Sequence, residues 1–129
     1  MARIEVPISV GELVDKVTIL EIKSEKIEDA GKHANIGREL DALTAVLTPL
    51  VAATPAIAPL KAELRSINET LWRIEDDIRD CERQRDFGPA FVELARSVYR
   101  TNDRRAATKR KIDELTGSEL VEEKSYAPY

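Results

Sequence analysis

Several residue types are scarce in this chain of 129 residues, and each scarcity excludes a class of protein. The single cysteine, Cys81, excludes an intrachain disulfide, and the single histidine, His33, excludes a histidine pair for metal binding or catalysis. No apolar run approaches the roughly 20 residues of a membrane span, and the N-terminus lacks the apolar core of a signal peptide. We therefore expect a cytoplasmic protein without a membrane span.

Neither positive nor negative charge is in large excess. The 24 acidic and 20 basic residues give a net charge of -4, which argues against a general nucleic-acid binder. The sequence contains no motif of a catalytic nucleophile, a metal-ligand set or a phosphate-binding loop. We therefore expect no resident metal or cofactor, and we favour a protein without catalytic activity.

The distribution of glycine and proline predicts the architecture. Neither residue occurs between Leu60 and Phe87 or between Ala90 and Thr116, which predicts two long helices, and apolar spacings of three and four predict two shorter helices before them. We expect a single all-α domain over residues 1–129, built as two antiparallel helical hairpins in a four-helix bundle-like arrangement. The helices are expected at about residues 10–29, 33–51, 57–86 and 89–116, between a short extended N-terminal arm and a C-terminal tail over residues 118–129.

Local signals predict where these helices begin and end. Ser9 and Glu12 form a capping box at the start of the first helix, and Gly31 is expected to end that helix as a left-handed cap. The second helix is expected to end near Pro49, and Gly117 is expected to close the fourth.

The third helix carries an apolar seam of the coiled-coil type. Its members alternate in spacings of four and three, namely Leu60, Leu64, Ile67, Leu71, Ile74, Ile78 and Cys81. At 1.5 Å per residue, the long helices reach roughly 40 Å and the short ones about 25 to 30 Å. The short hairpin cannot cover the whole seam, so a second copy, another protein or the tail must do so. We predict a homodimer.

Polar residues interrupt the apolar stripe of the fourth helix for about two turns. The stripe runs through Phe91, Leu94 and Val98, but Asn102, Arg105 and Lys109 follow before it resumes at Ile112. In one interpretation the bundle ends near Val98, or Arg105 and Lys109 form structural ion pairs with Glu21 and Glu28 of the first helix. In the other, Asn102, Arg105 and Lys109 line a cleft between helices and bind an anionic ligand or a partner's carboxylate, because a guanidinium binds carboxylate bidentately.

A cluster of carboxylates on the third helix supports a weaker interpretation. Asp76 and Asp80 share a face at i, i+4, as magnesium-binding carboxylates do in all-helical nucleotide hydrolases. Arg73, Arg79 and Arg83 intervene, however, so a charged surface is favoured over a metal site.

Longer strings of the sequence resemble a small bacterial family catalogued as a domain of unknown function. They are GELVDKVTILEIK at residues 11–23, IEDDIR at 74–79, YRTNDRRAATKR at 99–110 and GSELVEEKSY at 117–126. The resemblance implies no catalytic residues, but it implies an association with bacterial surface-polysaccharide synthesis. Glu21, Asn102, Arg105 and Lys109 fall inside these strings, as do Glu123, Lys124 and Tyr126 of the tail.

Two functions follow from these observations. The first is a non-catalytic, dimeric interaction or accessory module that uses the long hairpin and the tail to bind a protein partner. The alternative is a small all-α enzyme or binding protein that holds an anionic ligand in the cleft at Asn102, Arg105 and Lys109. Chorismate-type mutases, which bind a dicarboxylate through basic residues between helices, offer an analogy for this alternative.

Overall fold

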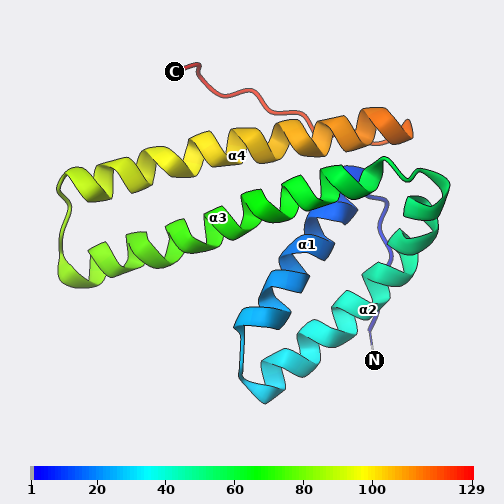
Figure 1. Ribbon diagram of the computed structural model, residues 1–129, viewed down its shortest axis with the longest axis horizontal. Helices are drawn as coiled ribbons and strands as arrows, with labels where there is room; N and C mark the ends of the chain where they lie inside the picture. Colours follow the sequence, from blue (N-terminus) through cyan, green and yellow to red (C-terminus); the bar gives the residue numbers. More distant parts are fainter. Residues whose placement is uncertain (1) are drawn as a thin grey trace.

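The computed structural model describes residues 2–129, and this part of the chain contains four helices and no strand. Helix α1 spans Val10–Lys26, α2 spans Ala30–Ala53, α3 spans Ile57–Gln84 and α4 spans Pro89–Thr116. They form two antiparallel hairpins, so the predicted all-α, four-helix bundle-like fold is confirmed. The hairpins cross (Figure 1): α1 meets the long hairpin near the start of α3 and the end of α4. None of the helices between Ala2 and Tyr129 combines the length and the apolar character needed to cross a membrane.

The boundary between α1 and α2 differs from the prediction. The Ser9 hydroxyl accepts a hydrogen bond from the Glu12 amide at 3.1 Å, as expected of the first helix cap. Helix α1 then ends at Lys26, because Ile27 is extended and the Asp29 carboxylate caps the next helix by accepting from the Lys32 amide at 2.9 Å. Gly31 therefore lies inside α2, and the prediction that it ends the first helix is wrong.

Helix α2 also continues past Pro49, which was expected to end it. Proline has no amide hydrogen, so Pro49 leaves the carbonyl of Ala45 without its helical donor. Both residues lie on the exposed side of α2, where water can satisfy that carbonyl, and the helix runs on to Ala53.

The core lies where the two hairpins cross. Helix α1 packs against each of the other three helices, and it supplies three of the buried apolar residues at the crossing. The buried apolar residues of this cluster are Leu13, Val14, Val17, Leu47, Ile57, Leu64 and Ile112. The rest of the molecule extends from this crossing, as Figure 1 shows.

The far half of the α3–α4 hairpin lies outside this core. In the described part of the chain, no residue between Glu75 and Arg100 is buried, although the stretch contains Ile78 and Cys81, the last two residues of the predicted seam. Phe87 and Val92 are 52% and 51% exposed. The short hairpin therefore covers only the near half of the long one.

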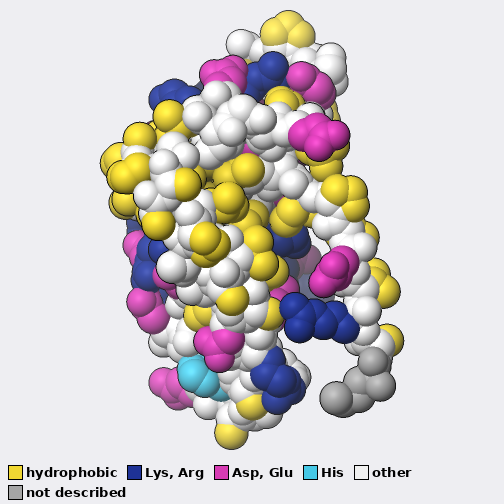
Figure 2. All heavy atoms as spheres, turned by 90° about the vertical axis from the view of Figure 1, so that its right-hand side faces the viewer, with side chains coloured by type: hydrophobic (Ala, Val, Ile, Leu, Met, Phe, Trp, Pro, Cys, Tyr) yellow, Lys and Arg dark blue, Asp and Glu magenta, His cyan; other side chains and the backbone are white. Residues whose placement is uncertain are grey.

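The two terminal segments have no regular secondary structure. The N-terminal arm carries Ile4 and Val6 with 84% and 65% of their surface exposed, and in Figure 2 it stands away from the helices. The tail, residues 118–129, turns back at Gly117, whose φ of 62° is left-handed, and runs antiparallel along α4 (Figure 1).

Candidate functional site

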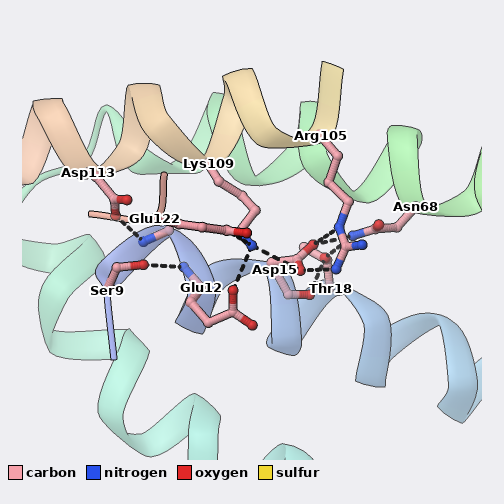
Figure 3. Close-up of polar contacts among 10 residues, drawn as sticks. Ser9, Glu12, Asp15, Thr18, Asn68, Arg105, Lys109, Asp113 and Glu122 are labelled. Carbon is pink, nitrogen blue, oxygen red and sulfur yellow. Dashed lines mark hydrogen bonds and ion pairs between the residues drawn. The ribbon is translucent and has the colours of Figure 1, made fainter. Parts of the chain in front are cut away.

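The polar stretch of α4 lies directly over the first half of α1, and its side chains form a network there (Figure 3). At the centre is Asp15, which is fully buried. Arg105 binds both carboxylate oxygens of Asp15: Nε donates to Oδ1 at 3.0 Å and Nη2 donates to Oδ2. The Asn68 amide from α3 also donates, to Asp15 Oδ1 at 2.8 Å and to Thr18 Oγ1 at 3.0 Å.

The contacts of Asp15 compensate for the burial of its carboxylate. A buried carboxylate costs several kcal/mol unless it is paired and its lone pairs are satisfied. Here a bidentate guanidinium and an amide meet that need, and the hydrogen bonds to Asp15 raise the pKa of Arg105 above its ordinary value. The Asp15–Arg105 pair therefore joins α1 to α4.

Lys109 continues the network toward the start of α1. Its side chain is only 8% exposed, and its Nζ donates to Glu12 Oε2 and to Glu122 Oε2, each at 2.6 Å. Burial acts to lower the pKa of Lys109, but the hydrogen bonds to the two carboxylates outweigh burial and raise it. The hydrogen bond from Lys109 in turn lowers the pKa of Glu122. The Glu12 side chain thus pairs with α4, and the reciprocal half of the expected capping box has no counterpart here.

The first amides of α1 are capped from three separate segments. Ser118 Oγ accepts from the Val10 amide at 3.2 Å, Asp113 Oδ1 from the Gly11 amide at 2.6 Å and Ser9 Oγ from the Glu12 amide. A carboxylate at a helix N-terminus is also favoured by the helix dipole. The end of α4 and the first residue of the tail therefore complete the start of α1.

Gly11 permits this close approach of α1 and α4. A Cβ at this position would lie 2.9 Å from Asp113 Oδ1, and closer still to the main-chain oxygen of Lys109. Gly117 is the only described glycine with a positive φ, so Gly11 is required for its size and not for its backbone conformation.

The predicted site residues on the helices do not form a single cluster. Arg105 and Lys109 lie together in the network, and Asn102 lines a neighbouring groove that Arg105 also borders. Glu21 is elsewhere, in a groove of about 640 Å³ among α1, α2 and α3, where Lys61 donates to Glu21 Oε2 at 3.1 Å.

The ion pairs expected of Arg105 and Lys109 with Glu21 and Glu28 are wrong. Helix α1 crosses α4 with its first half, so Glu12 and Asp15 are the partners, and Glu28 lies beyond the end of α1.

The tail residues named from the sequence also differ in their surroundings. Glu123 Oε2 accepts from Arg110 at 2.9 Å, and Lys124 lines a small cavity of about 220 Å³ together with Arg105 and Lys109. Tyr126 is 81% exposed. Glu122, the tail residue that reaches Lys109, was not among the site residues predicted from the sequence.

Asp15, Asn68 and Asp113 were also missed. The available signal was a second stripe on α1 at spacings of four and three, made of Gly11, Asp15, Thr18 and Ile22. All four are buried, and this stripe faces α3 and α4. Because α1 is buried on two faces, a carboxylate on its second face needs an ionic or hydrogen-bonding partner there.

The charges in the network explain what the arrangement can do. Arg105 and Lys109 are matched by the carboxylates of Asp15, Glu12 and Glu122, so the anions that these two cations hold come from the chain itself. Between Ala2 and Tyr129, no group of three or more His, Cys, Asp or Glu side chains is arranged to hold a metal ion. The network therefore fastens α1, α3, α4 and the tail together.

Fold and site together define an all-α protein of four helices whose hairpins are joined by a buried ion-pair network. The chain belongs to DUF6165, a family of unknown function, whose model matches residues 4–129. The expected membership of a family of unknown function is thereby confirmed. No curated protein and no solved structure gives a match to the chain.

Proposed function

We propose that this protein is a non-catalytic, homodimeric interaction module. The observation that carries the proposal is the uncovered half of the α3–α4 hairpin, where no residue between Glu75 and Arg100 of the described chain is buried. Two helices alone cannot bury a coiled-coil seam on all sides, and a third or fourth helix normally completes it. A second copy of the hairpin would supply two such helices.

A groove beside this half of the hairpin offers the contact surface. It has a volume of about 490 Å³ and lies where α1 diverges from α3 and α4. Its apolar part is formed by Ile19, Ile22, Leu71, Trp72 and Val98. Charged side chains, including Asp76 and Arg79, stand at its rim, as is usual around the apolar centre of a protein interface.

The charges of the two helices favour a second copy as the occupant. From Arg73 to Gln84, α3 carries five acidic and three basic residues, whereas α4 carries three basic and two acidic residues from Pro89 to Arg104. A twofold axis places the same surface on both copies, so α3 of one copy can lie against α4 of the other. That arrangement sets a segment of net charge -2 beside one of net charge +1 twice over.

Trp72 provides the test, because it is the only tryptophan and lines the groove. The emission of Trp72 is recorded while the protein is diluted from about 100 µM to 0.1 µM. Dissociation of a dimer exposes the indole, so we expect a red shift with a midpoint in the micromolar range. An emission maximum that stays constant over the whole range contradicts the proposal.

Two charge reversals distinguish the groove from other surfaces. Asp76→Lys reverses one charge at the rim of the groove, and we expect it to move the midpoint to at least tenfold higher concentration. Asp41→Lys makes the same change on the exposed side of α2, away from the groove, and should leave the midpoint unchanged. Equal effects of both variants would mean that net charge, and not the groove, controls association.

We also infer a cytoplasmic accessory role linked to bacterial surface-polysaccharide synthesis. The support is the resemblance of the four sequence strings to a bacterial family with that association. Loss of surface polysaccharide after deletion of the gene, restored by the wild-type chain but not by the Asp76→Lys variant, is the expected result. Normal polysaccharide after deletion contradicts this role.

A further inference from the structure

The tail is held to α4 by a few polar contacts and by little apolar packing. Every residue from Glu119 to Tyr129 is exposed, and the tail has no regular secondary structure. Its anchors are Glu122 on Lys109, Glu123 on Arg110, and the Tyr129 hydroxyl, which donates to Asp103 Oδ2 at 2.6 Å. The Tyr129 ring also packs edge-on against Tyr99. The tail therefore resembles a strap laid along α4 (Figure 1).

The site beneath this strap is more buried than the strap itself. The Lys109 side chain is 8% exposed, whereas Glu122 is 43% and Glu123 is 71% exposed. Glu12 holds the Lys109 ammonium from the opposite side (Figure 3), so Lys109 is positioned without help from the tail. The buried Lys109 and its half-exposed neighbour Arg110 present two adjacent positive charges to two adjacent carboxylates.

The wider charges are also complementary. From Arg100 to Lys111, α4 carries six basic residues and one acidic residue, and the tail carries three glutamates and one lysine. Each exposed ion pair favours the attached tail by roughly fivefold at most. A competing segment that offers carboxylates at the same positions can therefore displace the tail from α4.

We propose that Lys109 and Arg110 form a docking site for an acidic segment of a partner protein, which the tail occupies in the free protein. The partner presents two consecutive carboxylates in place of Glu122 and Glu123 and displaces the tail. This site lies at the crossing of the hairpins, so the proposal does not depend on dimerisation through the far half of the α3–α4 hairpin.

The test uses full-length protein and a labelled synthetic peptide with the sequence of residues 118–129. The tethered tail competes at an effective concentration in the millimolar range, so the wild-type protein should bind the peptide weakly. The double variant Glu122→Gln/Glu123→Gln releases the tethered tail, and we expect it to bind the peptide at least tenfold more tightly by fluorescence anisotropy. Equal affinity of the two proteins overturns the proposal.

Changes in the peptide provide controls that cannot unfold the protein. The peptide with Glu122→Gln and Glu123→Gln should lose at least tenfold in affinity for the double variant. The peptide with Glu119→Gln should bind unchanged, because Glu119 makes no ion pair with any residue from Ala2 to Tyr129. Equal binding of the first control peptide and the natural one overturns the assignment to carboxylates.

Two further measurements fix the site and the class of partner. Adding Lys109→Gln to the double variant should weaken peptide binding about fivefold, while adding Lys111→Gln, an exposed base on the same helix, should leave the affinity unchanged. A single-stranded oligonucleotide that binds the double variant as tightly as the peptide does would overturn the assignment to an acidic protein segment.

Discussion

The close approach of α1 and α4 makes the substitution Gly11→Ala a sharp test of the fold and the site together. The new methyl group would meet the main-chain oxygen of Lys109 and would lie 2.9 Å from Asp113 Oδ1. Neither group is the free end of a flexible side chain, because Asp113 is buried and bonded to the Gly11 amide. The two helices would have to separate.

The expected loss of stability combines two destabilising effects with one smaller stabilising effect. Overpacking a well-packed contact costs about 1 to 3 kcal/mol, and weakening the hydrogen bond to a buried carboxylate costs about 1.5 to 3 kcal/mol. The better helix propensity of alanine offsets at most about 1 kcal/mol of this loss. We therefore expect Gly11→Ala to lower the free energy of unfolding by about 2 to 4 kcal/mol.

Gly37 supplies a matched control within the same molecule. It lies inside α2, and a Cβ there would have no neighbouring atom within 4 Å. Gly37→Ala should therefore raise the free energy of unfolding by about 0.5 to 1 kcal/mol. Urea denaturation followed by circular dichroism measures both variants. A Gly11→Ala variant within about 0.5 kcal/mol of wild type would refute the close packing of α1 on α4.

Three other predictions concern the network, the tail and α2. Asp15→Asn should destabilise the protein by about 3 kcal/mol in urea, because it leaves Arg105 without its buried partner, whereas the exposed Asp77→Asn should stay within about 0.5 kcal/mol. Because the pKa of Glu122 is lowered, its contribution to tail attachment is complete above the ordinary value of 4.5 and is lost as the pH falls through the lowered pKa. Tail ¹⁵N relaxation should therefore show increased mobility in acid, and unchanged mobility there would contradict the Lys109–Glu122 pair. Pro49→Ala should stabilise α2 by about 1 to 3 kcal/mol by restoring a donor to the Ala45 carbonyl, and a loss of stability would contradict the helix through that position.

The sequence predicted the elements whose ends are marked by strong local signals. Helix α4 begins at Pro89 and ends before the left-handed Gly117, the range expected for it. The prediction for Gly31 was wrong because the Asp29 carboxylate caps α2, and this cap places Gly31 in the first turn of that helix. The error at Pro49 arose because Leu50 and Val51, which follow the proline, pack against the core, and this packing offsets the cost of a proline inside the helix.

The residues that pair with Arg105 and Lys109 could not be predicted from the sequence alone. Helical periodicity placed Arg105 and Lys109 on the inward face of α4, but the point at which α1 crosses that face depends on packing between helices. That crossing point decides whether Glu21 or Asp15 meets Arg105. The contact of Glu122 with Lys109 depends in addition on the path of a tail without periodicity.

The most direct test of the central claim, dimerisation through the far half of the α3–α4 hairpin, is the mass of the protein in solution. Sedimentation equilibrium at about 50 µM should give twice the chain mass of 14.5 kDa for the wild type. The Asp76→Lys variant, with its helical content unchanged, should shift toward the mass of one chain. A wild-type mass of 14.5 kDa throughout the micromolar range would contradict the account.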